Sequence, residues 1–214
     1  MPSDAAANPF GESVDRSRST VHIIADAVIG QQFDFGGQSS PEGAITLLLT
    51  DIEEAAKLLE RLGQPAAENL LRDHSALVNQ LVEGYGGEVV RAQADGFLVR
   101  FVSAHAALGC ALKLRDAFGG LPLPSTGAPL QIRIGLHTGH IIATEGNMFG
   151  RNVVLAARIA DHARGGEILV SSVLKEYTEN DLRYTFEPAG DMHFKGVARE
   201  HRIYSVRWRD LARD

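Results

Sequence analysis

Cysteine and long apolar runs are scarce in this sequence, and each scarcity excludes a class of protein. The single cysteine, Cys110, allows neither a disulfide nor a cysteine-ligated metal site within one chain. The longest apolar stretches have only the length of a strand, which argues against a membrane-spanning helix. The N-terminus has no basic flank followed by an apolar core, so we expect no secretory signal. We therefore expect a cytoplasmic protein without membrane contact.

The charge balance excludes a second class. The 214 residues carry a formal net charge of −6, which gives no general attraction to nucleic acid or to an anionic membrane. We expect neither as a partner. With 44% hydrophobic residues, the chain can bury one full core and fits a single domain of ordinary size.

The first part of the chain differs in composition from the rest. We expect residues 1–43 to be a partly flexible N-terminal extension, residues 44–208 to be one domain and residues 209–214 to be a short tail. Within the extension, the segment Thr20–Gly30 is apolar enough to be ordered. It could be a short strand or helix that packs on the core or on a second subunit, or the remnant of a junction to a regulatory element.

From Ala44 onward, hydrophobic spacing predicts elements in the order β-α-α-β-β-α-β, with further strands behind them. Helices are expected over 55–62, 65–83, 104–117 and 152–162, a hairpin around 95–96, and strands over 44–51, 130–137, 167–171 and 202–207, with one more strand between 137 and 152. This order predicts an α+β fold in which helices cover a mainly antiparallel sheet.

Two carboxylates stand at strand ends. Asp51 closes the apolar run that begins at Ala44, and Asp95 lies at a Gly turn between two strands. Such a pair in a small mixed domain indicates a metal site, because divalent ions are held by carboxylate oxygens. Taken singly, each position favours a commoner role, Asp51 that of a helix cap and Asp95 that of a turn residue.

Two later motifs add to this pair. Together with Gly135–Gly139 and Gly150–Arg158, the two carboxylates resemble, in order and spacing, the class III adenylyl/guanylyl cyclase catalytic domain. The resemblance covers residues 44–206 and implies a ferredoxin-like core. It also implies conversion of a nucleoside triphosphate, which we expect to be ATP, to a 3′,5′-cyclic nucleotide and pyrophosphate. The reaction would use two Mg²⁺ or Mn²⁺ ions per site, at a homodimer interface.

The resemblance assigns roles to individual residues. The metal ligands would be Asp51, Asp95 and the backbone carbonyl of Ile52. Arg158 would stabilise the transition state, since a guanidinium fork suits a pentavalent phosphorus. The alternative is that Arg158, among apolar helix neighbours, extends to a surface acidic group.

The substrate would meet three further residues. Arg91 and Asn147 occupy the positions that read the purine base, and this pair suits adenine without excluding guanine or a pyrimidine. Lys195 resembles the basic residue that meets the triphosphate. The alternatives are a solvated strand residue, a turn residue and a lone surface lysine, respectively.

Several residues depart from the family's pattern. Val154 replaces the Asn or His that orients the ribose, Glu53 and Glu54 replace the small residues that follow the first Asp, and Ala94 stands where Gly is usual. Acidic side chains repel a triphosphate unless they turn away. A second function is therefore open, namely a cyclase-like nucleotide-binding or dimerising module with weakened catalysis.

Overall fold

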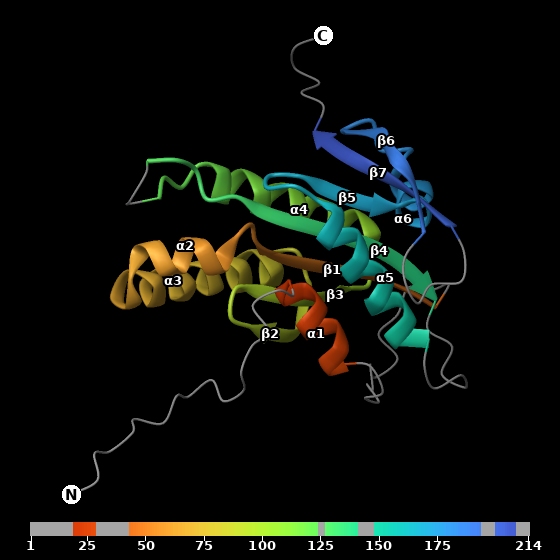
Figure 1. Cartoon of the computed structure of the whole chain (residues 1–214). Coiled ribbons are helices and arrows are strands. Elements are labelled where there is room, and N and C mark those ends of the chain that lie inside the picture. Colours follow the sequence, from red (N-terminus) through yellow and green to blue (C-terminus); the bar gives the residue numbers. More distant parts are fainter. Residues whose placement is uncertain (1–18, 29–42, 124–126, 141–147, 194–199, 209–214) are drawn as a thin grey trace, which may run out of the picture.

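One seven-stranded sheet organises the chain, with the strand order β2-β3-β1-β4-β5-β7-β6 (Figure 1). The computed structural model describes residues 19–28, 43–123, 127–140, 148–193 and 200–208. The strands are β1 (Ala44–Ile52), β2 (Glu88–Gln93), β3 (Gly96–Phe101), β4 (Ile132–His140), β5 (Ile168–Ser171), β6 (Tyr184–His193) and β7 (Glu200–Trp208). The helices are α1 (Thr20–Val28), α2 (Ala55–Leu62), α3 (Gln64–Gly84), α4 (Ala104–Gly119), α5 (Met148–His162) and α6 (Ser172–Thr178).

Strand pairing in the sheet is antiparallel except between β4 and β5, which run parallel. A parallel pair needs a crossover connection, and α5 provides it here. The predicted α+β fold with a mainly antiparallel sheet covered by helices is confirmed.

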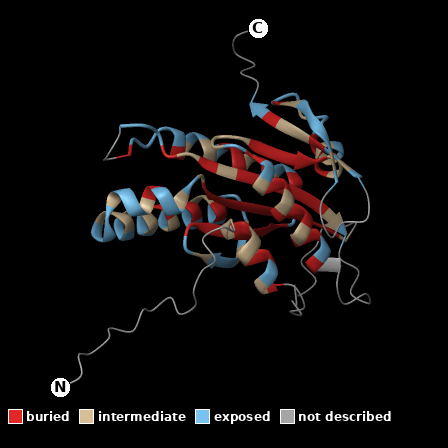
Figure 2. Cartoon of the chain, in the orientation of Figure 1, coloured by how far each residue is buried: buried red, intermediate tan, exposed pale blue. Residues whose placement is uncertain are grey.

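Helices cover both faces of the sheet, so the central strand β1 is buried along its whole length (Figure 2). Successive side chains of a strand point to opposite faces. Leu48 and Ile52 accordingly join the core under α2, α3, α4 and α6, whereas Leu47 and Leu49 join the core under α1 and α5. The same alternation directs Asp51 to the face that α1 and α5 cover.

The helix boundaries follow local signals in the sequence. α2 ends at Gly63, whose positive φ of 73° suits glycine, and Pro65 lies in the first turn of α3. Ser103 caps α4 by accepting a hydrogen bond from the backbone N–H of Ala106. We did not predict the short helix α6, although Ser171 caps it in the same way.

The segment left open in the sequence is a helix that packs on the core. α1 lies beside α5 and against β1 and β3 (Figure 1). Val21, Ile24, Ala25 and Val28 form its buried side. The strand expected between residues 137 and 152 falls partly on 141–147, which lie outside the described residues, and α5 occupies the positions from 148 onward. Among the described helices, none is long and apolar enough to cross a membrane.

Candidate active site

The two predicted metal carboxylates lie together at one end of β1. The backbone N–H of Ile52 donates a hydrogen bond to Asp95 Oδ2 over 3.0 Å, so the hairpin carboxylate is attached to the residue that follows Asp51. Strand register causes this meeting, since Thr50 pairs with Phe97 and brings the β2–β3 turn to the end of β1. Antiparallel pairing of β1 with β3 thus brings the two aspartates together, although they are far apart in the sequence.

An arginine that we did not predict from the sequence binds the carboxylate of Asp51. Arg133 is the cross-strand partner of Asp51 in the β1–β4 pairing. Its Nε donates to Asp51 Oδ1 over 2.9 Å and its Nη2 to Oδ2 over 2.6 Å, a two-pronged pairing. A second carboxylate, Asp161 on α5, lies 3.6 Å from the same guanidinium. The signal for this role is the charged residue inside the alternating run Ile132-Arg133-Ile134.

Helix α1 supplies the remaining contacts to the two carboxylates. The Ser19 hydroxyl, which immediately precedes the helix, donates to Asp51 Oδ2 over 3.0 Å. The Thr20 hydroxyl donates to Asp95 Oδ1 over 2.8 Å. With the contacts from β1 and β4, each of the four carboxylate oxygens accepts at least one hydrogen bond.

Burial dominates the electrostatics of the pair. Asp51 is 1% exposed and Asp95 is 3% exposed. Burial raises the pKa of the Asp51 carboxyl above its ordinary value, with the Arg133 guanidinium opposing this and the neighbouring Asp95 adding to it. Burial likewise raises the pKa of Asp95, against the hydrogen bonds from Thr20 and from Ile52.

The donor set suits a divalent cation held by oxygen. The described residues contain no cluster of three or more His, Cys, Asp or Glu side chains that could hold a metal. The two adjacent carboxylates could instead be completed by a backbone carbonyl, water and substrate oxygens, as hard cations such as Mg²⁺ accept. Two carboxylates facing one arginine also leave a negative charge that a cation would balance.

Arg158 lies on α5 and is half-buried. Its Nη1 contacts Nε2 of His22, on α1, and its buried Nε has no hydrogen-bond partner in the described part of the chain. Nδ1 of His22 lies 3.8 Å from Asp161 Oδ1. Within one chain, therefore, α1 stands in contact with the predicted transition-state arginine as well as with the carboxylate pair.

The predicted substrate residues are placed unevenly. Arg91 pairs with Leu98 through the edge strand β2, and its exposed side chain has no hydrogen bond or ion pair to another described residue. Asn147 and Lys195 lie outside the described residues. Val154 is half-buried on α5, one turn before Arg158.

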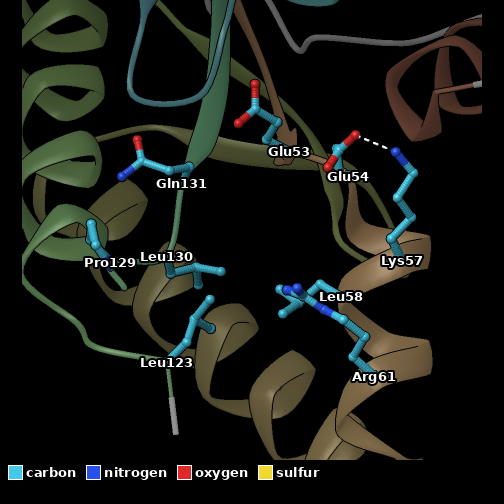
Figure 3. A pocket seen from close by; sticks show the side chains of 9 residues that line it. All are labelled: Glu53, Glu54, Lys57, Leu58, Arg61, Leu123, Pro129, Leu130 and Gln131. Carbon is cyan, nitrogen blue, oxygen red and sulfur yellow. Dashed lines mark hydrogen bonds and ion pairs between the residues drawn. The ribbon is translucent and has the colours of Figure 1, made fainter. Parts of the chain in front are cut away.

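The two acidic residues after the first aspartate point to separate partners. Glu53 Oε1 accepts a hydrogen bond from the Gly165 backbone N–H over 2.7 Å, and Glu54 Oε1 lies 2.5 Å from Lys57 Nζ. Both also line a surface pocket with Lys57, Arg61 and apolar side chains from the core under α2, α3, α4 and α6 (Figure 3). Neither Asp51 nor Asp95 lines this pocket, so it is separate from the carboxylate pair.

His137 serves a polar network that joins three elements. Its Nδ1 is 2.9 Å from Ser171 Oγ, and its Nε2 is 3.3 Å from Asn152 Oδ1. The Asn152 side chain also donates to the His140 carbonyl over 3.2 Å. Burial lowers the pKa of His137 to about 4, so the ring is neutral at pH 7. This network holds α5 to β4 and β5 and takes no part in the carboxylate site.

Known proteins share this fold. The solved structure of the adenylyl cyclase CyaB from P. aeruginosa superposes with a TM-score of 0.67 at 24% identity, covering 78% of this chain and 95% of that one. The guanylate cyclase domain of RhGC from Catenaria anguillulae, solved in complex with GTP, gives a TM-score of 0.66 at 19% identity and covers 78% of this chain and 98% of that one. Both likenesses show the fold alone.

Sequence comparison identifies the family. An uncharacterized protein of Mycobacterium tuberculosis is 33% identical over 135 residues, which are 62% of this chain and 44% of that protein. The chain thus spans less than half of that relative. The family described as the adenylate and guanylate cyclase catalytic domain matches residues 38–207, which include both carboxylates and Arg158. The chain belongs to the family of adenylate and guanylate cyclase catalytic domains.

Proposed function

We propose that this chain is a nucleotide cyclase that converts ATP to 3′,5′-cyclic AMP and pyrophosphate. The observation that carries the proposal is the convergence of Asp51 and Asp95, from separate elements, at the end of β1. Together with the backbone carbonyl of Ile52, they would hold two Mg²⁺ or Mn²⁺ ions. When bound, such ions would activate the ribose 3′-hydroxyl and neutralise the triphosphate.

The arginine of the site would come from a second chain. Arg158 contacts His22 of its own chain, and no described contact joins it to Asp51 or Asp95. A guanidinium that stabilises the transition state must reach the phosphorus beside the metal carboxylates. A two-fold homodimer in which each chain lends Arg158, Arg91 and Asn147 to its partner's carboxylates meets this need.

The choice of ATP rests on the base-reading residues and on the likeness to an adenylyl cyclase. The side chain of Arg91 is exposed and has no hydrogen bond or ion pair to another described residue, so it is available to a base. Lys195 would meet the triphosphate. The alternative is that the substrate is GTP or a pyrimidine nucleotide, because a guanylate cyclase domain superposes equally well.

A catalytically weakened nucleotide-binding or dimerising module is the second candidate function. Two observations favour it. Val154 has no polar group with which to orient a ribose, and both carboxylates are sealed from solvent. Turnover distinguishes the two candidates.

Incubation of the purified chain with each ribonucleoside triphosphate and Mn²⁺, followed by mass spectrometry of the products, tests the proposal. Cyclic AMP should form from ATP, and Asp95→Asn should abolish it because the substitution removes a ligand charge without removing volume. Circular dichroism should show that the variant remains folded. Wild-type turnover by Asp95→Asn would refute the metal assignment, and the absence of every cyclic product would favour the binding module.

The shared site is tested by mixing two inactive variants. Asp51→Asn and Arg158→Ala homodimers should each be inactive, whereas a mixed dimer holds one intact site and one doubly damaged site. Random pairing makes about half of the dimers mixed, so activity should recover to about a quarter of wild type. Light scattering must show a dimer that exchanges subunits. No recovery under those conditions would mean that one chain builds the whole site.

A further inference from the structure

Helix α1 and the serine before it contact three residues of the proposed site, namely Asp51, Asp95 and Arg158. The hydroxyls of Ser19, just before the helix, and of Thr20, its first residue, donate to the two carboxylates, and the ring of His22, two residues further on, contacts Arg158. A chain of the proposed dimer contributes its carboxylates to one site and its arginine to the other. One short helix thus engages the contributions to both sites.

The contacts at the N-terminus of α1 stabilise the negative charge of the carboxylates, as bound cations would. The first turn of a helix carries a partial positive charge, and here it lies against two buried carboxylates together with two hydroxyl donors. Ser19 also accepts from Arg133 Nη2 over 3.1 Å, so the hydroxyl is part of the ion pair with Asp51. Each hydrogen bond occupies one of the lone-pair sites of these oxygens, so fewer remain for a metal.

The rest of α1 is anchored by apolar packing. Val21, Ile24, Ala25 and Val28 are 0–3% exposed and pack on apolar side chains of β1, β3 and α5. The fit is close at the hairpin, since a Cβ on Gly96 would lie 2.6 Å from Thr20 Cγ2 and 2.9 Å from Ile24 Cδ1. α1 therefore covers an apolar surface that directly adjoins the carboxylate pair.

We infer that this covered surface is the docking surface for a second copy of the chain, and that α1 competes with that copy for it. The inference rests on the proposed function. Arg158 of a partner must approach Asp51 and Asp95 through the space in which Ser19 and Thr20 lie, and two groups cannot fill one space. Displacement of α1 opens the carboxylates to metal and uncovers an apolar face of the kind that a subunit interface buries.

A pair of substitutions on α1 isolates its docking. Ile24→Glu places a charge on the buried side of the helix, whereas Ile23→Glu places the same charge one residue away, on a half-buried side chain outside the packed cluster. Both full-length variants are compared with wild type by circular dichroism. Mn²⁺ binding is measured without nucleotide by electron paramagnetic resonance, and mass by light scattering over a range of protein concentrations.

Ile24→Glu should bind Mn²⁺ at least about tenfold more tightly than wild type, because the affinity of a site rises with the fraction of molecules in which it is open. Its dimer should also form at a protein concentration at least about tenfold lower. Ile23→Glu should match wild type in both. A second variant keeps the test valid if Ile24→Glu does not fold. Ser19→Ala with Thr20→Val preserves the packing and removes only the two hydroxyls. It should raise Mn²⁺ affinity severalfold.

Equal Mn²⁺ affinity and equal mass in wild type and in folded Ile24→Glu would overturn the inference, as would equal affinity in the hydroxyl variant if Ile24→Glu fails to fold. Tighter Mn²⁺ binding without a shift toward dimer would overturn the second copy as the competing partner. Adding Asp95→Asn separates this inference from the proposed function. If Ile24→Glu dimerises but its Mn²⁺ binding survives Asp95→Asn, the metal assignment fails while the docking surface stands.

Discussion

Replacement of His74 by leucine should stabilise the protein, and the gain should grow as the pH falls. His74 lies on α3 and is 1% exposed. Its ring packs against Phe118 at 4.8 Å and Phe97 at 5.6 Å between centroids, and neither ring nitrogen has a hydrogen-bond partner among the described residues. A buried polar group without a partner costs about 1–3 kcal/mol. We expect His74→Leu to recover about that amount at pH 8.

The pH dependence follows from the pKa of the same ring. Burial lowers the pKa of His74 to about 4 from an ordinary value of 6.5. Between these two values the unfolded chain binds a proton that the folded chain refuses, so stability present above pH 6.5 is lost as the pH falls toward 4. The loss amounts to about 2 kcal/mol between pH 8 and pH 5, and to about 3 kcal/mol in full.

Urea unfolding followed by circular dichroism at pH 8, 6.5 and 5 measures both effects. The difference in unfolding free energy between His74→Leu and wild type should widen by about 2 kcal/mol from pH 8 to pH 5. Wild-type losses from other groups, including His137 with its pKa of about 4, cancel in this difference. His105→Leu, at an exposed position of α4, is the matched control and should show no such widening. A difference that stays constant with pH would refute the reasoning.

Two further predictions concern the departures from the family's pattern and the base. Ala94 and Glu54 have positive φ values of 50° and 51°, which L-residues adopt at a cost, so Ala94→Gly should raise the unfolding free energy by up to about 1 kcal/mol. Ala92→Gly, on the exposed part of β2, is the control and should lower it; a loss at both positions would contradict the strain argument. Arg91→Ala should change the ratio of kcat/KM among nucleotides by up to about 3 kcal/mol while leaving urea stability unchanged, and the exposed Arg207→Ala should change neither. An unaltered nucleotide preference would mean that Arg91 only meets solvent.

The sequence predicted the elements whose signals are local. The helix expected over residues 55–62 is α2, because Gly63 ends it, and the hairpin around Asp95 and Gly96 forms where the turn residues stand. We did not predict α6, because seven residues are too few to show a helical periodicity. Its N-cap Ser171 is the one local signal for a helix start there. Strand β4 extends to His140, beyond the expected end, since pairing with β1 continues to Ala44.

The candidate site was predictable only where motif spacing carried it. Asp51 and Asp95 could be singled out because each follows a strand pattern. The role of Arg133 depended on the register between β1 and β4, which no local pattern sets, although its charge inside an apolar strand was a signal. Ser19 and Thr20 gave none. Their contacts exist because a helix far away in the sequence docks on the sheet, and docking is decided by tertiary packing.

The structure also bears on the expected repulsion between a triphosphate and the acidic residues after Asp51. A pair of free carboxylates at this point would repel a triphosphate, but Glu53 is anchored on the Gly165 N–H and Glu54 is paired with Lys57. Glu54 has the left-handed backbone that a glycine would favour, with a φ of 51°. The departure in sequence therefore costs local strain at Glu54, whose charge Lys57 balances, whereas Glu53 is held by a backbone hydrogen bond. Val154, by contrast, has an apolar side chain that offers no hydrogen bond to a ribose, so ribose orientation is the step of the proposed reaction at which this chain departs most from the family's pattern.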